Sequence, residues 1–171
     1  RFYHTEYRYD DYYHQVLLPH RMSNFGPALS SSVINSDGLL DVFVGNGFDS
    51  NGAVYVQNEE GQFEKSEKLL QDEKQYEDMD ALFFDADGDG DDDLYVVSGG
   101  NALPANSTRY RDRLYENRQG ILSYVESALP SQMIASGSRV VSADWDQDGD
   151  LDLIVRGRLT PQQYPNPGKS F

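Results

Sequence analysis

Two stretches of nine residues combine carboxylates and glycine at a spacing suited to a hard divalent cation. Both Asp85–Asp93 (DADGDGDDD) and Asp144–Asp152 (DWDQDGDLD) carry aspartate at every odd position and glycine at position 6. A tight loop turns alternate side chains inward, and the glycine permits the sharp turn. Calcium accepts roughly six to eight oxygen ligands in flexible geometry, whereas magnesium requires a tighter octahedron and more water. The candidate calcium ligands, with position 7 expected to offer its backbone carbonyl, are Asp85, Asp87, Asp89, Asp91, Asp93, Asp144, Asp146, Asp148, Asp150 and Asp152.

A third stretch, Val33–Asp41, has the same outline but lacks the first carboxylate. Val33 stands where the first ligand is expected, so Asn35, Asp37, Leu39 and Asp41 form a weaker candidate set. The glycines at position 6 of the three stretches are 52 and 59 residues apart. That period suits one small sheet per repeat. We therefore expect two calcium sites, at Asp85–Asp93 and Asp144–Asp152. Whether Val33–Asp41, which is the first loop along the chain, also binds calcium is left open.

Acidic stretches of this kind also occur in EF-hands and in plain solvated turns. An EF-hand requires a bidentate glutamate at position 12 and helices on both sides. Position 12 is Val96 in one stretch and Val155 in the other, each inside a β-prone run, so the EF-hand does not fit. A solvated acidic turn without an ion is the simpler alternative, because aspartate and glycine favour turns. Two matches at corresponding places in a repeat favour the metal.

The residues around these loops predict short strands. The segments on both sides of each loop are rich in β-branched and aromatic residues. These segments are Ala81–Phe84 and Leu94–Val97 around one loop, and Arg139–Ala143 and Leu153–Arg156 around the other. Further hairpins are predicted after Val54 and after Leu114, each turning at a glycine. Four short antiparallel strands per repeat are typical of a β-propeller blade. The predicted fold is therefore all-β.

The third repeat has no second hairpin, so the chain carries about two and a half blades. A closed propeller needs roughly four to eight. We therefore expect the chain to be part of a longer protein, or the other blades to come from elsewhere. The expected division is a Tyr-rich segment over residues 1–21, a first blade over 22–70, a second over 71–130 and an incomplete third over 131–171.

Composition excludes several classes of function. The formal net charge of −15, from 14 basic and 29 acidic residues, opposes nucleic-acid binding. The lack of cysteine excludes disulfides and thiolate chemistry, and no apolar run is long enough for a transmembrane helix. The Tyr-rich stretch Arg1–Tyr13 is predicted to be an edge strand on the first blade, and Lys65–Glu77 a charged loop with one helical turn. Glu77 and Asp78 are predicted to be structural.

These features resemble the FG-GAP/VCBS repeat family, whose integrin-α-like propellers carry such calcium loops. Phe25–Pro27 resembles the start of a repeat and Leu114–Asn117 the strand that follows a loop. A narrower resemblance, to large Bacteroidetes surface proteins of the ASPIC/UnbV type, comes from three short segments, Leu17–His20, Asp112–Tyr115 and Tyr164–Pro165. The resemblance implies a propeller of about seven blades. It also implies export, often as a lipoprotein at the outer membrane of a Gram-negative bacterium, and no catalysis within the repeats.

The expected function is a calcium-stabilised, non-catalytic binding or scaffold module at the cell surface. Its expected partners are an envelope protein complex, such as an outer-membrane transporter, or a polysaccharide. The alternative is the propeller part of a carbohydrate-active enzyme, a lyase or a glycosidase. That alternative stays open because paired carboxylates suffice for glycoside hydrolysis and the chain is rich in acids.

Overall fold

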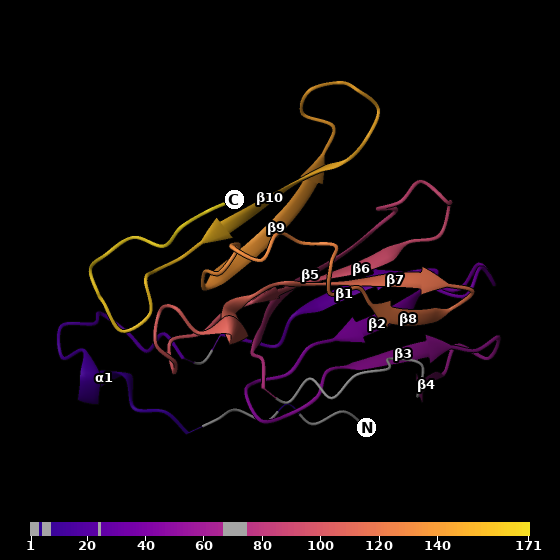
Figure 1. The fold of residues 1–171 in the computed structure, drawn as a ribbon. Coiled ribbons are helices and arrows are strands. Elements are labelled where there is room, and N and C mark those ends of the chain that lie inside the picture. The colour runs from indigo at the N-terminus through magenta and orange to yellow at the C-terminus, as the bar shows by residue number, and fades with distance from the viewer. Residues whose placement is uncertain (1–3, 5–7, 24, 67–74) are drawn as a thin grey trace.

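The chain is almost entirely β over the residues that the computed structural model describes, which are residue 4 and residues 8–23, 25–66 and 75–171 (Figure 1). Helical structure in these ranges is limited to the short helix α1 (Asp11–His14) and the 3-10 turn η1 (Thr108–Tyr110). The strands, in chain order, are β1 (Leu29–Ser32), β2 (Asp41–Val44), β3 (Ala53–Gln57), β4 (Phe63–Ser66), β5 (Asp78–Phe84), β6 (Asp93–Ser98), β7 (Arg113–Arg118), β8 (Ile121–Tyr124), β9 (Gly137–Ala143) and β10 (Asp152–Gly157).

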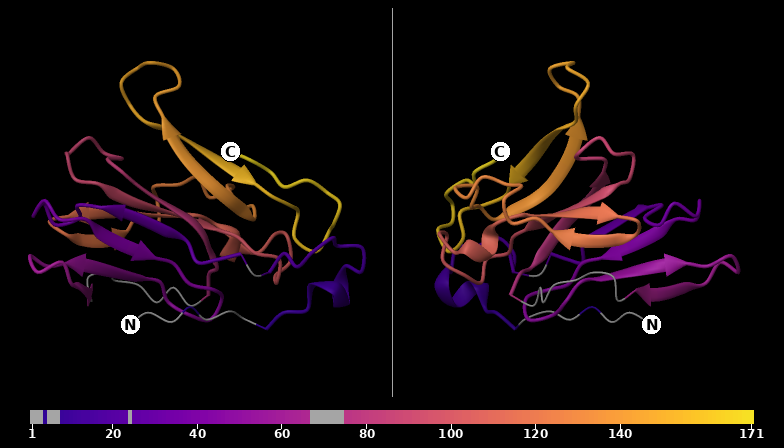
Figure 2. Two further views of the ribbon diagram at one scale, coloured as in Figure 1. Left: turned by 180° about the vertical axis from the view of Figure 1, so that it is seen from behind. Right: turned by 45° about the vertical axis from the view of Figure 1, so that its right-hand side comes forward.

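The strands form two four-stranded antiparallel sheets and one hairpin. The order is β1-β2-β3-β4 in the first sheet and β5-β6-β7-β8 in the second, and β9 pairs with β10 alone. The first strands of the three units lie next to one another, β1 beside β5 and β5 beside β9. Figure 2 shows the hairpin standing at an angle to the two sheets, with its loop projecting from the body. The predicted fold class, all-β with propeller blades of four antiparallel strands, is confirmed, and the arrangement is open rather than closed.

The central strand β6 joins two apolar cores because successive side chains of a strand point to opposite faces. Leu94 and Val96 pack into the core shared with the first sheet, beside Phe43. Tyr95 and Val97 pack into the core shared with the β9–β10 hairpin. All six residues of β6 are buried, and with its neighbour β5 it contributes side chains to both cores that join the three units.

The N-terminal segment differs from its prediction as an edge strand on the first blade. Over its described residues it forms α1. The side chain of Asp11 is fully buried. Its carboxylate accepts hydrogen bonds from the backbone amides of Met22 and Ser23 and from the hydroxyl of Ser23. The Nδ2 of Asn101, in the loop after β6, donates to the same carboxylate at 2.6 Å. The edge-strand prediction is therefore wrong there, since a buried acid fastens the segment to the second blade.

Two further expectations concern helices. The turn predicted within Lys65–Glu77 falls mainly on residues 67–74, which lie outside the described residues. Within the described ranges, no helix has the length and apolarity required to cross a membrane.

Candidate metal centres

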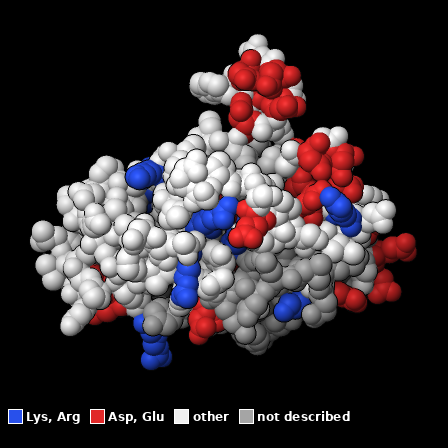
Figure 3. All heavy atoms as spheres, in the orientation of Figure 1, with Lys and Arg blue, Asp and Glu red and all other residues white. Residues whose placement is uncertain are grey.

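The three acidic stretches connect the first two strands of each unit. The strand pairs end at Ser32–Asp41, at Phe84–Asp93 and at Ala143–Asp152, so each loop starts and ends on neighbouring strands. Figure 3 shows acidic side chains gathered over the loop beyond β5 and β6 and over the loop that projects beyond β9 and β10. The sheet register therefore fixes both ends of each loop, which is what a preformed ligand set requires.

Two groups of carboxylates converge as the spacing predicted. One oxygen from each of Asp85, Asp87 and Asp89 lies within 4.8 Å of the others. The same holds for the corresponding triad of the loop between β9 and β10, which comprises Asp144, Asp146 and Asp148. Asp85 is half-buried and the other five are exposed. Three converging hard oxygen donors, with room for water or backbone oxygens, fit calcium.

The two loops fold alike because their own side chains hold the backbone. In the second repeat, the amide of Gly90 donates to Asp85 at 3.1 Å, that of Asp89 to Asp87 at 3.2 Å, and that of Asp91 to Asp89 at 2.9 Å. The third repeat has the equivalent bonds at 3.2, 3.2 and 3.0 Å. The position 6 glycines have φ of +94° and +102°, a conformation that favours glycine.

The position 9 aspartates accept backbone hydrogen bonds at the end of each loop, and their predicted role as metal ligands stays a prediction. The triads do not include Asp93 or Asp152, nor the position 7 aspartates Asp91 and Asp150. Asp93 instead accepts hydrogen bonds from the backbone amides of Ala86, at position 2, and Asn117, in β7. The corresponding acceptor in the third repeat, Asp152, binds the amide of Trp145. The position 9 carboxylate therefore closes the loop and, in the second repeat, ties it to the next strand.

Asp93 is 2% exposed, and burial raises the pKa of its carboxyl, an effect that the two backbone donors partly offset. We expect Asp93→Asn to destabilise the fold by about 1–3 kcal/mol, because an amide cannot accept on both sides and leaves one buried N–H unpaired. Asp152→Asn is the matched control, since Asp152 is exposed and receives a single backbone bond among the described residues. Urea unfolding with and without calcium measures both. Equal losses for the two variants would contradict this role.

The first loop is held together by protein donors. The Nδ2 of Asn35 donates to one oxygen of Asp37 at 2.9 Å, and the amide of Leu39 donates to the other at 2.8 Å. Asp41, at position 9, accepts from the amides of Ile34 and Gln57, as Asp93 does in the second repeat. The described residues contain no triad of acids here. This loop has Val33 at position 1 and an asparagine at position 3 that donates to Asp37, so it lacks two of the three carboxylates of the other loops.

The first two loops also contact each other. The Ser36 hydroxyl donates to Asp91 at 3.3 Å, and Ser32 donates to Asp92. Asn117, which is 1% exposed, donates from its side chain to the carbonyls of Ile34 and Asp92 at 2.9 and 3.1 Å. In the sequence, this asparagine is marked only as the last residue of the motif Leu114–Asn117 (Leu-Tyr-Glu-Asn). That motif is the one sequence signal that could have identified Asn117 as a residue joining two repeats.

Two four-stranded blades and a hairpin in an open arrangement, with aspartate triads in the first loops of the second and third units, define a class, the β-propeller repeat proteins. The model of the FG-GAP-like repeat matches this chain twice, over residues 34–96 and 85–155. The chain belongs to the FG-GAP-like repeat family. That match describes a repeat module and indicates no catalytic family. No curated protein matches the chain, and the narrower Bacteroidetes origin stays a prediction.

Proposed function

We propose that this chain is a calcium-stabilised, non-catalytic propeller module that displays binding surfaces on the outside of a cell. The observation that supports it most is the pair of aspartate triads at equivalent places in consecutive repeats. Repetition with the same backbone bonds supports a function for the carboxylates beyond solubility. The family match supports the propeller architecture that would place them.

Asp85, Asp87 and Asp89 would hold one ion, and Asp144, Asp146 and Asp148 the other. A bound calcium ion supplies the positive charge that offsets repulsion among three converging carboxylates. In the second repeat the effect extends past the loop, because Asp93 and Asn117 connect the loop to β7 and to the first repeat. The ion would thereby stabilise the contact between blades as well as a single hairpin.

The proposed location is the outer surface of a Gram-negative bacterium, with a lipid anchor upstream of these residues. Calcium loops suit that setting, because about 1 mM free calcium outside a cell would keep sites with a Kd of about 10 µM occupied. A rigid propeller with exposed loops is a suitable frame for binding an envelope protein complex or a polysaccharide. The carboxylate pair closest to the enzyme alternative, Glu77 and Asp78, is buried, and Asp78 forms an ion pair with Arg113, which favours the non-catalytic function.

Calorimetric titration of the chelator-stripped protein with calcium tests the proposal. We expect two sites in the unaltered chain and one in each of the variants Asp89→Ala and Asp148→Ala. Asp37→Ala in the first loop is the control and should leave two sites. Absence of saturable binding, or two sites retained in both triad variants, would contradict the assignment.

A further inference from the structure

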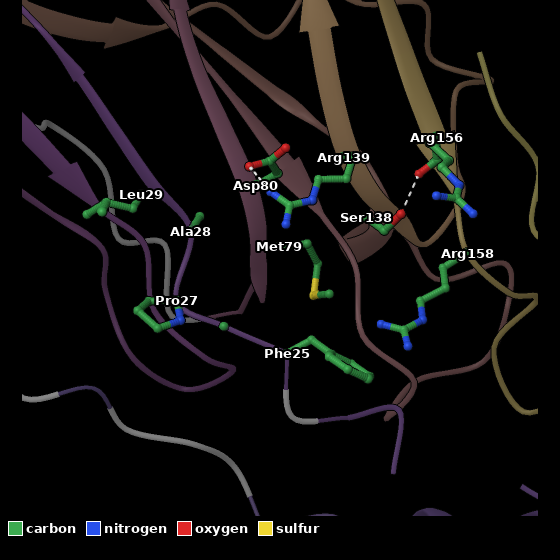
Figure 4. Close-up of a pocket in the computed structure, with 11 residues that line it drawn as sticks. Phe25, Pro27, Ala28, Leu29, Met79, Asp80, Ser138, Arg139, Arg156 and Arg158 are labelled. Atoms are coloured by element: carbon green, nitrogen blue, oxygen red, sulfur yellow. Dashed lines mark hydrogen bonds and ion pairs between the residues drawn. The ribbon is translucent and has the colours of Figure 1, made fainter. Parts of the chain in front are cut away.

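A cavity of about 660 Å³ lies where the beginnings of the three units meet. Its walls come from the segment that leads into β1, from the start of β5, and from β9 and β10 with the residues just after it (Figure 4). The acidic triads are at the other ends of β5 and β9, after Phe84 and Ala143. The cavity is therefore a separate feature from the candidate metal centres.

The charge of this cavity is opposite to that of the whole chain. It is lined by Arg139, Arg156 and Arg158, and Asp80 is the one acidic residue among the described residues that line it, although the chain has a net charge of −15. Arg139 lies 3.6 Å from Asp80, and its side chain is 75% exposed. Within the described ranges, neither Arg156 nor Arg158 forms an ion pair with a carboxylate. The cavity therefore carries excess positive charge.

Arg158 is held in place by groups that do not neutralise it. Its guanidinium lies 3.7 Å from the ring centroid of Phe25, and one of its nitrogens is 3.0 Å from Nε2 of His20. Partial burial lowers the pKa of Arg158, and the positive charge of Arg156 lowers it further, so the two guanidinium groups affect each other. Figure 4 shows Arg158 pointing toward Phe25, with Met79 between it and Arg139. The guanidinium groups of Arg156 and Arg158, beside the apolar ring of Phe25, are suited to binding an anion.

We propose that this cavity binds a small ligand through an oxyanion, either a carboxylate or a sulfate, with Arg156 and Arg158 as the main contacts. A guanidinium group presents paired N–H donors that match such an oxyanion. Met79 and Pro27 offer apolar surface to the remainder of the ligand, for example the ring of an acidic sugar. A long polyanion fits less well, because the acidic surface outside the cavity would repel it. A small anionic ligand of this class would be what the proposed binding module recognises, so the site rests on that proposed function.

Calorimetry with three probes, sodium sulfate, glucuronate and neutral glucose, tests the site at constant ionic strength and saturating calcium. We expect sulfate and glucuronate to bind and glucose not to bind. Tighter binding of glucuronate than of sulfate would show that a sugar ring contributes, and equal binding that the oxyanion suffices; both results support the site. Absence of binding by both anions would overturn it.

The variants Arg156→Gln and Arg158→Gln should each weaken anion binding by about tenfold or more, because each removes a charge-assisted contact. Both side chains belong to exposed residues, so the variants are expected to fold. Arg118→Gln is the matched control, since this exposed arginine pairs with Glu116 away from the cavity and should leave anion binding unchanged. Unaltered binding in both cavity variants would also overturn the site. Calcium stoichiometry on the same samples tests the proposed function separately, so the two failures are distinguishable.

Discussion

Removing calcium from the loaded protein with EGTA is expected to lower its melting temperature by about 10–20 °C. A site with Kd of about 10 µM at about 1 mM free calcium contributes about 2.7 kcal/mol to the free energy of unfolding. Two such sites amount to a large share of the roughly 5–15 kcal/mol of an ordinary domain. For a chain of this size, each kcal/mol corresponds to about 2–4 °C. Scanning calorimetry measures the shift.

Single substitutions divide this effect between the loops. Asp89→Ala should lower the melting temperature in calcium by about 5–10 °C, and EGTA should then cause a smaller further drop, since one site is already lost. Asp37→Ala is the control in the loop that has no acid triad among the described residues. An EGTA-insensitive melting temperature in a calcium-loaded sample would contradict the structural role of the ion.

Substituting Asp78 with alanine is expected to reduce the free energy of unfolding by about 3–5 kcal/mol, because it removes the carboxylate that pairs with the buried guanidinium of Arg113. Asp78 and Arg113 are 3% and 2% exposed, and their charged groups lie 2.5 Å apart. The Asp78 carboxylate also accepts from the amide of Asn46 at 2.9 Å, so it links the end of β2 to β5 and β7. Urea unfolding at fixed calcium measures the loss.

The geometry around Asp78 leaves little room for repacking. A Cβ atom built on Gly45 would lie 2.5 Å from Cβ of Asp78 and 2.9 Å from that of Ala28, so the first two blades approach closely there. The exposed pair Arg118–Glu116 is the matched control, and Glu116→Ala should shift the melting temperature little. Combining Asp78→Ala with Arg113→Met should cost less than the sum of the two single changes. Strict additivity would contradict a coupled pair.

The sequence predicted the parts of this structure that depend on local patterns. Alternating apolar residues and the spacing of aspartates and glycine identified the strands, the loops and the convergence of Asp85, Asp87 and Asp89. The role of Asp93 was not predictable in this way, because its second donor is the amide of Asn117, on a strand that only the sheet brings close. The prediction of a strand before residue 14 was wrong over the described residues for the same reason, since Asp11 has a hydrogen-bond partner 90 positions away, Asn101.

The cationic cavity illustrates the same limit. Phe25, Asp80, Arg139 and Arg156 are far apart in the chain, and no local motif connects them. Only the arrangement of β1, β5 and the β9–β10 hairpin places them together. Within an acidic chain, a small group of arginines becomes informative once their shared location is known.

Calcium binding by the two aspartate triads is tested most directly by an anomalous difference map from crystals grown in calcium. We expect one peak among the carboxylates of Asp85, Asp87 and Asp89 and a second among those of Asp144, Asp146 and Asp148. A map with no peak at either triad, from crystals in which both loops are ordered, would contradict calcium binding by these loops.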